Sequence, residues 1–254
     1  MGNVGIQLFS VWREAEKDFL GTVKKMADLG YDGIQFAGFF QTPAEPLKKV
    51  MDDHGIVAAG SHTGIHLLTG DDFERTLEYN DKIENRLVIV PALPKEMRQT
   101  ADDYKRTAEL LNGIGEKCYD AGFTFGYHNH EFEFNEFDGK TGFDLLFEQT
   151  DPMFVKVELD CYWAAFSDHD PLEIIQKYKD RVVSLHMKDM KLVDGKKTGT
   201  EIGNGQLDLK SLITIGKQHS VEWFTVEQEE FETDPFEALK INAQNLHAMV
   251  VKEG

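Results

Sequence analysis

Three polar residues close apolar runs that lie far apart in the sequence. Asp160 ends VELD, His186 ends VVSLH and Glu227 ends WFTVE. Each has an ordinary structural interpretation, such as a helix cap for Asp160, but a carboxylate that ends a buried run is costly without a partner. Carboxylates and an imidazole together suit Mn²⁺, Mg²⁺, Co²⁺ or Zn²⁺, and such an ion polarises a carbonyl. We therefore predict one divalent metal ion bound by these three residues.

A further ligand can come from the segment GYHNHEFEF, residues 126–134. If this segment is extended, its alternation directs His128 and His130 to the same side. Glu133 can return to the ion from the loop that follows. The residues leave His128 and Glu133 both open as ligands, and a hydrogen-bonded rim that only shapes the pocket is the alternative for the two histidines.

Other polar or aromatic residues at predicted strand ends are candidates for substrate contacts. We expect His62 in GSHTG to bind a substrate hydroxyl and Trp163 to stack on a sugar ring. Glu158 and His130 are further candidates for substrate binding. Lys188 in LHMKD is expected to stabilise developing negative charge or to neutralise Asp189, which follows it.

These residues must be positioned by an alternation of short β-rich runs and amphipathic stretches, which is typical of βα units around a parallel sheet. Continuous apolar runs such as LVIV indicate strands that are buried on both faces. We count eight strands: Val4–Phe9, Gly33–Ala37, Val57–Gly60, Leu87–Val90, Thr124–His128, Val155–Asp160, Val182–His186 and Phe224–Glu227. The pattern predicts an α/β fold, a single (β/α)₈ TIM barrel, in which strand ends meet at one cavity.

Helical periodicity predicts core-facing helices at Glu14–Leu29 and Thr107–Ala121. Glycines in ADLGYDGI, DDHGIVAA and YDAGFTFG suit left-handed helix caps, and Asp170-Pro171 and Asp234-Pro235 suit helix starts. The βα rhythm loosens at Glu131–Thr141 and Met187–Gln206, which we interpret as long loops over the cavity. No linker or composition shift marks a boundary, so residues 1–254 are predicted to form one barrel domain.

The net charge of −18 at pH 7 excludes some classes of partner. A strongly negative field repels nucleic acid and anionic membranes and favours a neutral, polyhydroxylated small molecule. No apolar run reaches the length of a membrane span, and no export signal is evident, so we expect a cytoplasmic protein. A periplasmic location is the alternative if an export signal preceded residue 1. Barrels of this size often pair through their outer helices, which makes a homo-oligomer an open expectation.

Several enzyme classes lack their sequence motifs. The segment GNGQLD is not GxGxxG, no GxxxxGK[ST] occurs, and no GxSxG elbow surrounds a serine. A dinucleotide enzyme, a P-loop enzyme and a nucleophilic hydrolase are therefore disfavoured. A metal-dependent endonuclease would need more histidine ligands and a basic cleft, which the charge argues against.

The chain resembles the xylose-isomerase-like superfamily of sugar phosphate isomerases and epimerases, which are TIM barrels with one divalent ion. The resemblance covers nearly the whole chain and is carried by IQLFSVW, ADLGYDGIQFAGF, GSHTG, YHNHEFEF, VELDCYW, LHMKDM, GNGQLDL and VEQEEF. In that family Glu, Asp, His and Glu commonly hold the ion, and the last three correspond to Asp160, His186 and Glu227. The first ligand departs from the pattern, because this chain has His128-Asn129-His130 there. We favour Glu133, which keeps three carboxylates, over His128.

The resemblance implies a metal-dependent sugar isomerase or epimerase that removes a proton next to a metal-chelated carbonyl of a keto or aldehydo sugar or cyclitol. Glu227 and Glu133 would act on opposite faces of the carbon, or a histidine such as His128 would replace Glu133 as the base. The chain also resembles inosose dehydratases and lyases of 3-keto sugars, which begin with the same step. If His128 binds the ion, elimination becomes the better prediction. A non-catalytic carbohydrate-binding barrel is the alternative from another class.

Overall fold

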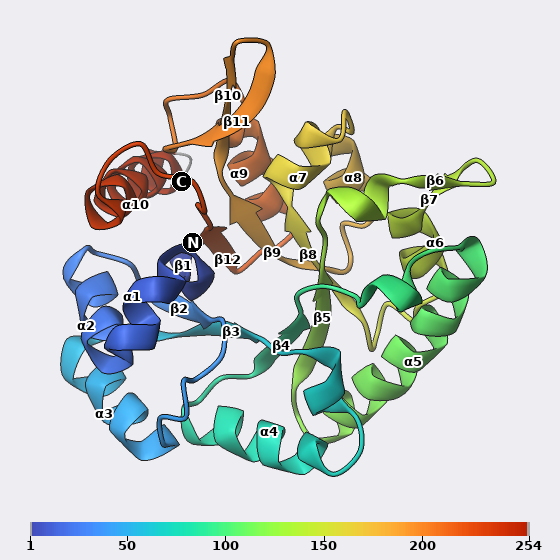
Figure 1. Ribbon diagram of the computed structural model, residues 1–254, viewed down its shortest axis with the longest axis horizontal. Helices are drawn as coiled ribbons and strands as arrows, with labels where there is room; N and C mark the ends of the chain where they lie inside the picture. Colours follow the sequence, from blue (N-terminus) through green and yellow to red (C-terminus); the bar gives the residue numbers. More distant parts are fainter. Residues whose placement is uncertain (1, 253–254) are drawn as a thin grey trace.

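Eight parallel strands close into a barrel in the computed structural model, which describes residues 2–252 (Figure 1). The order around the barrel is β1-β12-β9-β8-β5-β4-β3-β2, and every pair in it is parallel. The strands are β1 (Asn3–Gln7), β2 (Gly33–Phe36), β3 (Val57–His62), β4 (Leu87–Val90), β5 (Thr124–His128), β8 (Lys156–Asp160), β9 (Val182–Met187) and β12 (Trp223–Val226). This confirms the predicted α/β barrel, and each strand lies within two residues of its expected ends.

Helices form the outer ring of the barrel (Figure 1). They are α1 (Trp12–Lys17), α2 (Phe19–Asp28), α3 (Ala44–His54), α4 (Asp72–Lys82), α5 (Ala101–Asp120), α6 (Gly142–Glu148), α7 (Cys161–Phe166), α8 (Pro171–Lys177), α9 (Leu209–Gln218) and α10 (Pro235–Lys252). Short 3₁₀ segments add η1 (Leu8–Val11), η2 (Ile65–Leu68), η3 (Lys95–Met97) and η4 (Glu131–Phe134). The first predicted helix is divided at Asp18, whose carboxylate caps α2 by accepting a hydrogen bond from the Gly21 amide at 2.9 Å.

The predicted helix ends are confirmed where the structure places caps. Gly55 ends α3 with a φ of 66°, in the left-handed region that glycine enters at little cost. Asp170 caps α8 through the Leu172 amide at 2.8 Å, and Asp234 caps α10 through the Phe236 amide at 3.0 Å.

Two hairpins replace the long loops that we expected. After β5 the chain forms η4 and the pair β6 (Glu136–Phe137) and β7 (Lys140–Thr141), and after β9 it forms β10 (Asp189–Val193) and β11 (Lys196–Thr200). Both project from the barrel in Figure 1. An Asp-Gly pair with positive φ turns each hairpin, at residues 138–139 and 194–195. This dipeptide is the two-residue turn signal that the loop interpretation overlooked.

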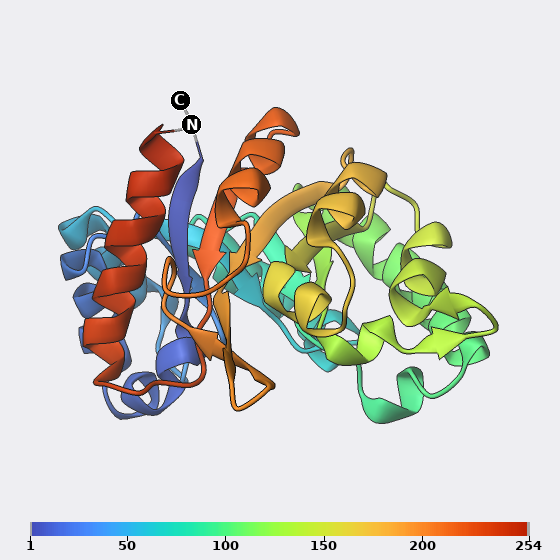
Figure 2. The same cartoon turned by 90° about the horizontal axis from the view of Figure 1, so that it is seen from above.

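The N-terminal end of the barrel is filled by Trp223. A Cβ atom added to Gly33 would lie 2.4 Å from its indole ring, and one added to Gly5 would lie 3.4 Å from it. Glycines on neighbouring strands thus make room for one large ring. α10 then covers β1, as Figure 2 shows from above, and the Tyr31 hydroxyl donates to the Leu239 carbonyl at 2.8 Å. Polar side chains are left to occupy the opposite, C-terminal end of the strands.

Candidate metal centre and active site

Two register irregularities in the barrel occur beside residues of the site. The pairing of β2 with β3 shifts between Ile34 and Gln35, and that of β8 with β9 shifts between Val157 and Glu158. Such irregularities re-aim a side chain, and here Gln35 and Glu158 both turn into the barrel and meet. Gly60 lies opposite Gln35 with a φ of 135°, a conformation suited to glycine. The local backbone is thus shaped around this polar pair.

Glu158 is the centre of a buried hydrogen-bond network. Its Oε1 lies 2.7 Å from Nε2 of His62, 3.2 Å from Nδ1 of His128 and 3.0 Å from Nε2 of His186. Its Oε2 accepts a hydrogen bond from the Gln35 amide, which in turn is bound by Gln7. The Glu158 side chain is fully buried. Both of its oxygens therefore bind protein groups, and our expectation that Glu158 contacts substrate has no support in this geometry.

The carboxylate of Glu158 determines how the three imidazoles are protonated. An ionised carboxylate only accepts hydrogen bonds, so each ring nitrogen that faces it carries a proton. The other nitrogen of His128 is Nε2, which remains available, whereas the other nitrogen of His186 is Nδ1, which lies 2.9 Å from the Glu227 carboxylate and is protonated as well. Burial alone would raise the pKa of Glu158, but the neighbouring His186 and the hydrogen bonds from the imidazoles hold it well below its usual value.

His128, Asp160, His186 and Glu227 form a group that can hold one metal ion. One ligand atom from each lies within 4.8 Å of the others, and all four side chains are buried. They come from β5, β8, β9 and the residue after β12, so neighbouring strand ends converge as the barrel predicts. Asp160 also caps α7 through the Trp163 amide at 2.8 Å. The helix-cap interpretation of Asp160 is therefore correct and compatible with a role as a ligand.

An unpartnered buried atom shows that this group fits a metal ion. Nε2 of His128 has no hydrogen-bond partner among the described residues, although an orphaned buried nitrogen is costly. A second group, His62, His128, Glu158 and His186, also lies within 4.8 Å. In that group the ring nitrogens already donate to Glu158, and the orphaned nitrogen would stay unused. The first group therefore fits an ion better, and the second orients its histidines.

The pKa shifts in the site reflect buried carboxylates that have few positive charges near them, as in a site that binds a cation. Burial, together with the nearby Glu227, raises the pKa of Asp160 to about 7 against the opposing effect of His186. Against the effect of burial, Glu158 and Glu227 raise the pKa of His186 well above its usual value. Burial and the neighbouring His186 lower the pKa of His128 to about 3. The neutral His128 ring is thus ready to bind an ion, whereas His186 must release its Nδ1 proton.

Glu133 is not brought into this group. It lies in η4, where its carboxylate accepts the hydroxyl of Tyr127 and the backbone amide of His130, the latter at 2.7 Å. Full burial raises its pKa to about 8 against these hydrogen bonds, so the group is largely neutral near pH 7. His128, and not Glu133, therefore lies in the group of candidate ligands, because a short turn folds the Glu133 carboxylate back onto its own backbone.

Lys188 and Asp189 are not paired with each other. The Lys188 ammonium binds the carboxylate of Glu229 and lies over the ring of Tyr162 at 4.1 Å. Asp189 instead accepts backbone hydrogen bonds from residues 190, 203, 205 and 207, at 2.8, 3.0, 2.9 and 3.1 Å. Successive strand residues point to opposite sides, so Lys188 faces the site and Asp189 holds the loop after β11.

A cavity of about 390 Å³ opens above the candidate ligands. It is lined by Phe9, Trp12, Ala37, His62, Gly64, Pro91, Ala92, His128, His130, Glu227 and Glu229. His62 and His130 therefore lie where a substrate contact was expected. Trp163 is placed beside His130, with ring centroids 6.1 Å apart, but it is not among the lining residues.

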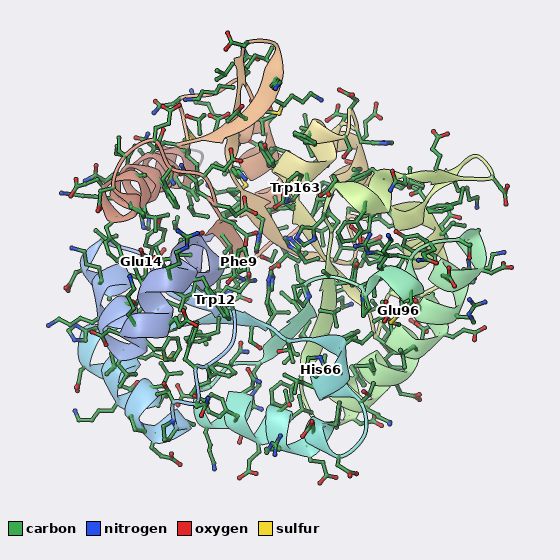
Figure 3. The ribbon with its side chains drawn as sticks, in the orientation of Figure 1. Phe9, Trp12, Glu14, His66, Glu96 and Trp163 are labelled. Carbon is green, nitrogen blue, oxygen red and sulfur yellow. The ribbon has the colours of Figure 1, made fainter. Side chains whose placement is uncertain are left out.

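Sequence reasoning missed four contributors to this region. Gln7 and Gln35 stand within apolar runs, IQLF and GIQF, where a buried amide was itself the signal. Phe9 was assigned to the first strand and Trp12 was not singled out, yet both line the cavity from η1 and α1. Figure 3 shows them side by side at the mouth of the barrel.

Comparisons with known proteins agree with this fold. The model of the xylose isomerase-like TIM barrel family matches residues 23–248. An inosose dehydratase of Clostridium tetani is 24% identical, over 85% of this chain and 84% of the relative. A structure of a sugar phosphate isomerase/epimerase from Parabacteroides distasonis is 25% identical with a TM-score of 0.81, covering 97% of this chain and 98% of the other. An L-ribulose 3-epimerase structure, 16% identical with a TM-score of 0.73 over 100% of this chain and 96% of that one, shares the fold.

No helix within residues 2–252 is long and apolar enough to cross a membrane.

Proposed function

Because the chain belongs to the xylose isomerase-like TIM barrel family, we propose that it is a metal-dependent enzyme that removes a proton next to the carbonyl of a neutral keto sugar or cyclitol and then eliminates a hydroxyl. One observation supports the choice of elimination: the group of candidate ligands contains His128, and Glu133 instead binds the His130 amide. An epimerase of the expected kind needs two metal-bound glutamates on opposite faces of the carbon, and of the expected pair, Glu227 and Glu133, only Glu227 is in the group. The inosose dehydratase relatives support the same choice.

His128, Asp160, His186 and Glu227 would hold the ion, which polarises the substrate carbonyl when bound. His130 is the best candidate for the base. Its Nδ1 is buried and has no hydrogen-bond partner within residues 2–252, and it lines the cavity, while burial lowers its pKa and keeps the ring neutral. The C–H bond then breaks toward His130, and the C–O bond breaks on the adjacent carbon. Glu229 lines the same cavity and is paired with Lys188, so the Glu229 carboxyl can supply the proton to the departing hydroxyl.

A neutral substrate is supported by the lining of the cavity. None of the described residues that line it is Lys or Arg, whereas Glu227 and Glu229 are both acidic. A phosphorylated sugar would meet these carboxylates without a cationic partner other than the ion. His62 and the ion together can instead orient hydroxyl groups.

The second candidate is an epimerase or isomerase, because His130 and Glu227 both line the cavity and can serve opposite faces of one carbon. Incubation of inosose and simple ketoses in D₂O with Mn²⁺, followed by proton NMR, distinguishes elimination from epimerisation or isomerisation. Elimination releases water and leaves an unsaturated or deoxy-dicarbonyl product, while epimerisation gives an isomer deuterated next to the carbonyl. EDTA should stop both reactions. Bound sugar without any deuterium exchange would contradict both and favour the carbohydrate-binding barrel.

A further inference from the structure

Two exposed aromatic residues form one wall of the cavity. Phe9 is 52% exposed and Trp12 is 39% exposed, although both are large apolar side chains. Their ring centroids are 6.1 Å apart. The aromatic pair follows β1 and stands between Glu227, after β12, and Ala37, after β2, while His62 and His130 line the cavity from β3 and from the segment after β5.

The backbone that braces Trp12 is held in an unfavourable conformation. Phe40 and Gln41 are consecutive non-glycine residues with positive φ values of 49° and 57°. Such conformations cost free energy and cluster at ligand sites. Here they place the ring of Phe40 against Trp12, with centroids 4.7 Å apart, and against Phe19 at 5.2 Å. An exposed ring that is braced in this way is fixed in orientation rather than free to fold onto the surface.

The aromatic pair is also linked to the polar network of the metal centre. The side-chain oxygen of Gln7 accepts a hydrogen bond from the Phe9 amide at 3.1 Å, and its amide group donates to Gln35. Gln35 in turn binds Glu158. One chain of hydrogen bonds thus sets both the histidines and the start of η1. The distance between the candidate ion and the aromatic wall is therefore fixed by rigid groups.

We propose that Phe9 and Trp12 form a subsite for a second sugar ring, so that a neutral glycoside is preferred as substrate over the corresponding free monosaccharide. This rests on the proposed function for the position of the first ring. Sugar rings present a C–H face that packs on aromatic rings while their hydroxyls stay in water, which suits half-exposed side chains at a cavity mouth. The acidic residues of the lining repel an anionic second group, and Phe9 and Trp12 are too exposed to enclose a fully apolar second group.

The subsite can be tested by binding alone, using saturation-transfer NMR and calorimetry on the intact protein. The probes are cellobiose, maltose and trehalose, with glucose as the single-ring reference. At least one disaccharide should bind about tenfold more tightly than glucose, which corresponds to about 1.4 kcal/mol. Trp12→Ala and Phe9→Ala should each remove most of this difference, while Trp12→Phe should keep it. Tyr119→Ala, on a ring of similar exposure in α5 that is not among the lining residues, is the matched control.

Equal affinity for glucose and all three disaccharides, or a preference that survives Trp12→Ala, would overturn the subsite. Because both rings are exposed, these variants should fold, and circular dichroism checks this. The result is independent of catalysis. Deuterium exchange without disaccharide preference contradicts only the subsite, and preference without exchange contradicts only the proposed reaction.

Discussion

At the scale of single residues, Glu158 is the group on which the hydrogen bonds of the three site histidines converge. It was predicted only as a substrate contact, since the sequence places it two residues before Asp160 without indicating which side chains surround it. In the structure it fixes the protonation of His128 and His186 without entering the cavity. Carboxylates behind metal-binding histidines typically contribute a factor of ten to a hundred in metal affinity.

Glu158→Gln is therefore expected to weaken Mn²⁺ or Zn²⁺ binding by about ten- to hundredfold while preserving the fold. A glutamine keeps the volume, but its amide group cannot accept hydrogen bonds from three imidazoles. Calorimetric metal titration measures the effect, and Glu116→Gln, a change in an exposed carboxylate of α5, is the control. Unchanged affinity in Glu158→Gln would show that the histidines are oriented by packing alone.

The identity of the fourth ligand gives a second residue-scale prediction. His128→Ala should abolish stoichiometric metal binding, as should Asp160→Ala, because each removes one of four ligands. Glu133→Gln should retain it, since the Glu133 carboxylate is used by Tyr127 and the His130 amide. Metal content after dialysis, measured by atomic emission, decides between them. Loss of metal in Glu133→Gln together with retention in His128→Ala would restore the carboxylate that we first favoured.

At the scale of elements, the strands were predictable and the connections were not. Runs such as LVIV are buried on both faces, so their hydrophobicity alone locates β4 within its observed bounds. The residues at strand ends could be predicted to converge for the same reason. Glu133 could not be placed, because a carboxylate three residues into a turn can equally reach an ion or its own backbone. The hairpins were missed although Asp138-Gly139 and Asp194-Gly195 each indicate a two-residue turn.

Asp189 supports a prediction about these connections. Three of its four backbone hydrogen bonds tie residues 203, 205 and 207 to the base of the β10–β11 hairpin, and the fourth comes from the neighbouring Met190. Asp189→Ala leaves these amides without a buried acceptor, and we expect a loss of roughly 2–4 kcal/mol in the free energy of unfolding. Chemical denaturation measures the loss, and hydrogen exchange should show amides 203, 205 and 207 deprotected first. The exposed Asp180→Ala is the control, and equal stability of the two variants would contradict the anchoring role.

At the scale of the whole molecule, the candidate ion would join strands β5, β8, β9 and β12, half of the barrel wall. Asp160 and Glu227 are buried side by side, and burial together with Glu227 raises the pKa of Asp160 although His186 and Lys188 oppose this effect. A ligand that binds only the folded state stabilises it by mass action, by about 2.7 kcal/mol at a hundred times its dissociation constant. For a barrel of this size the midpoint of thermal unfolding should rise by roughly 5–10 °C with Mn²⁺ and return with EDTA.

Asp160→Asn should lose this response, yet its metal-free form should be at least as stable as the metal-free wild type, since one of two like charges is gone. If metal-free Asp160→Asn unfolds at a much lower temperature than metal-free wild type, the main contribution of Asp160 to stability is the capping of α7 and not the binding of an ion.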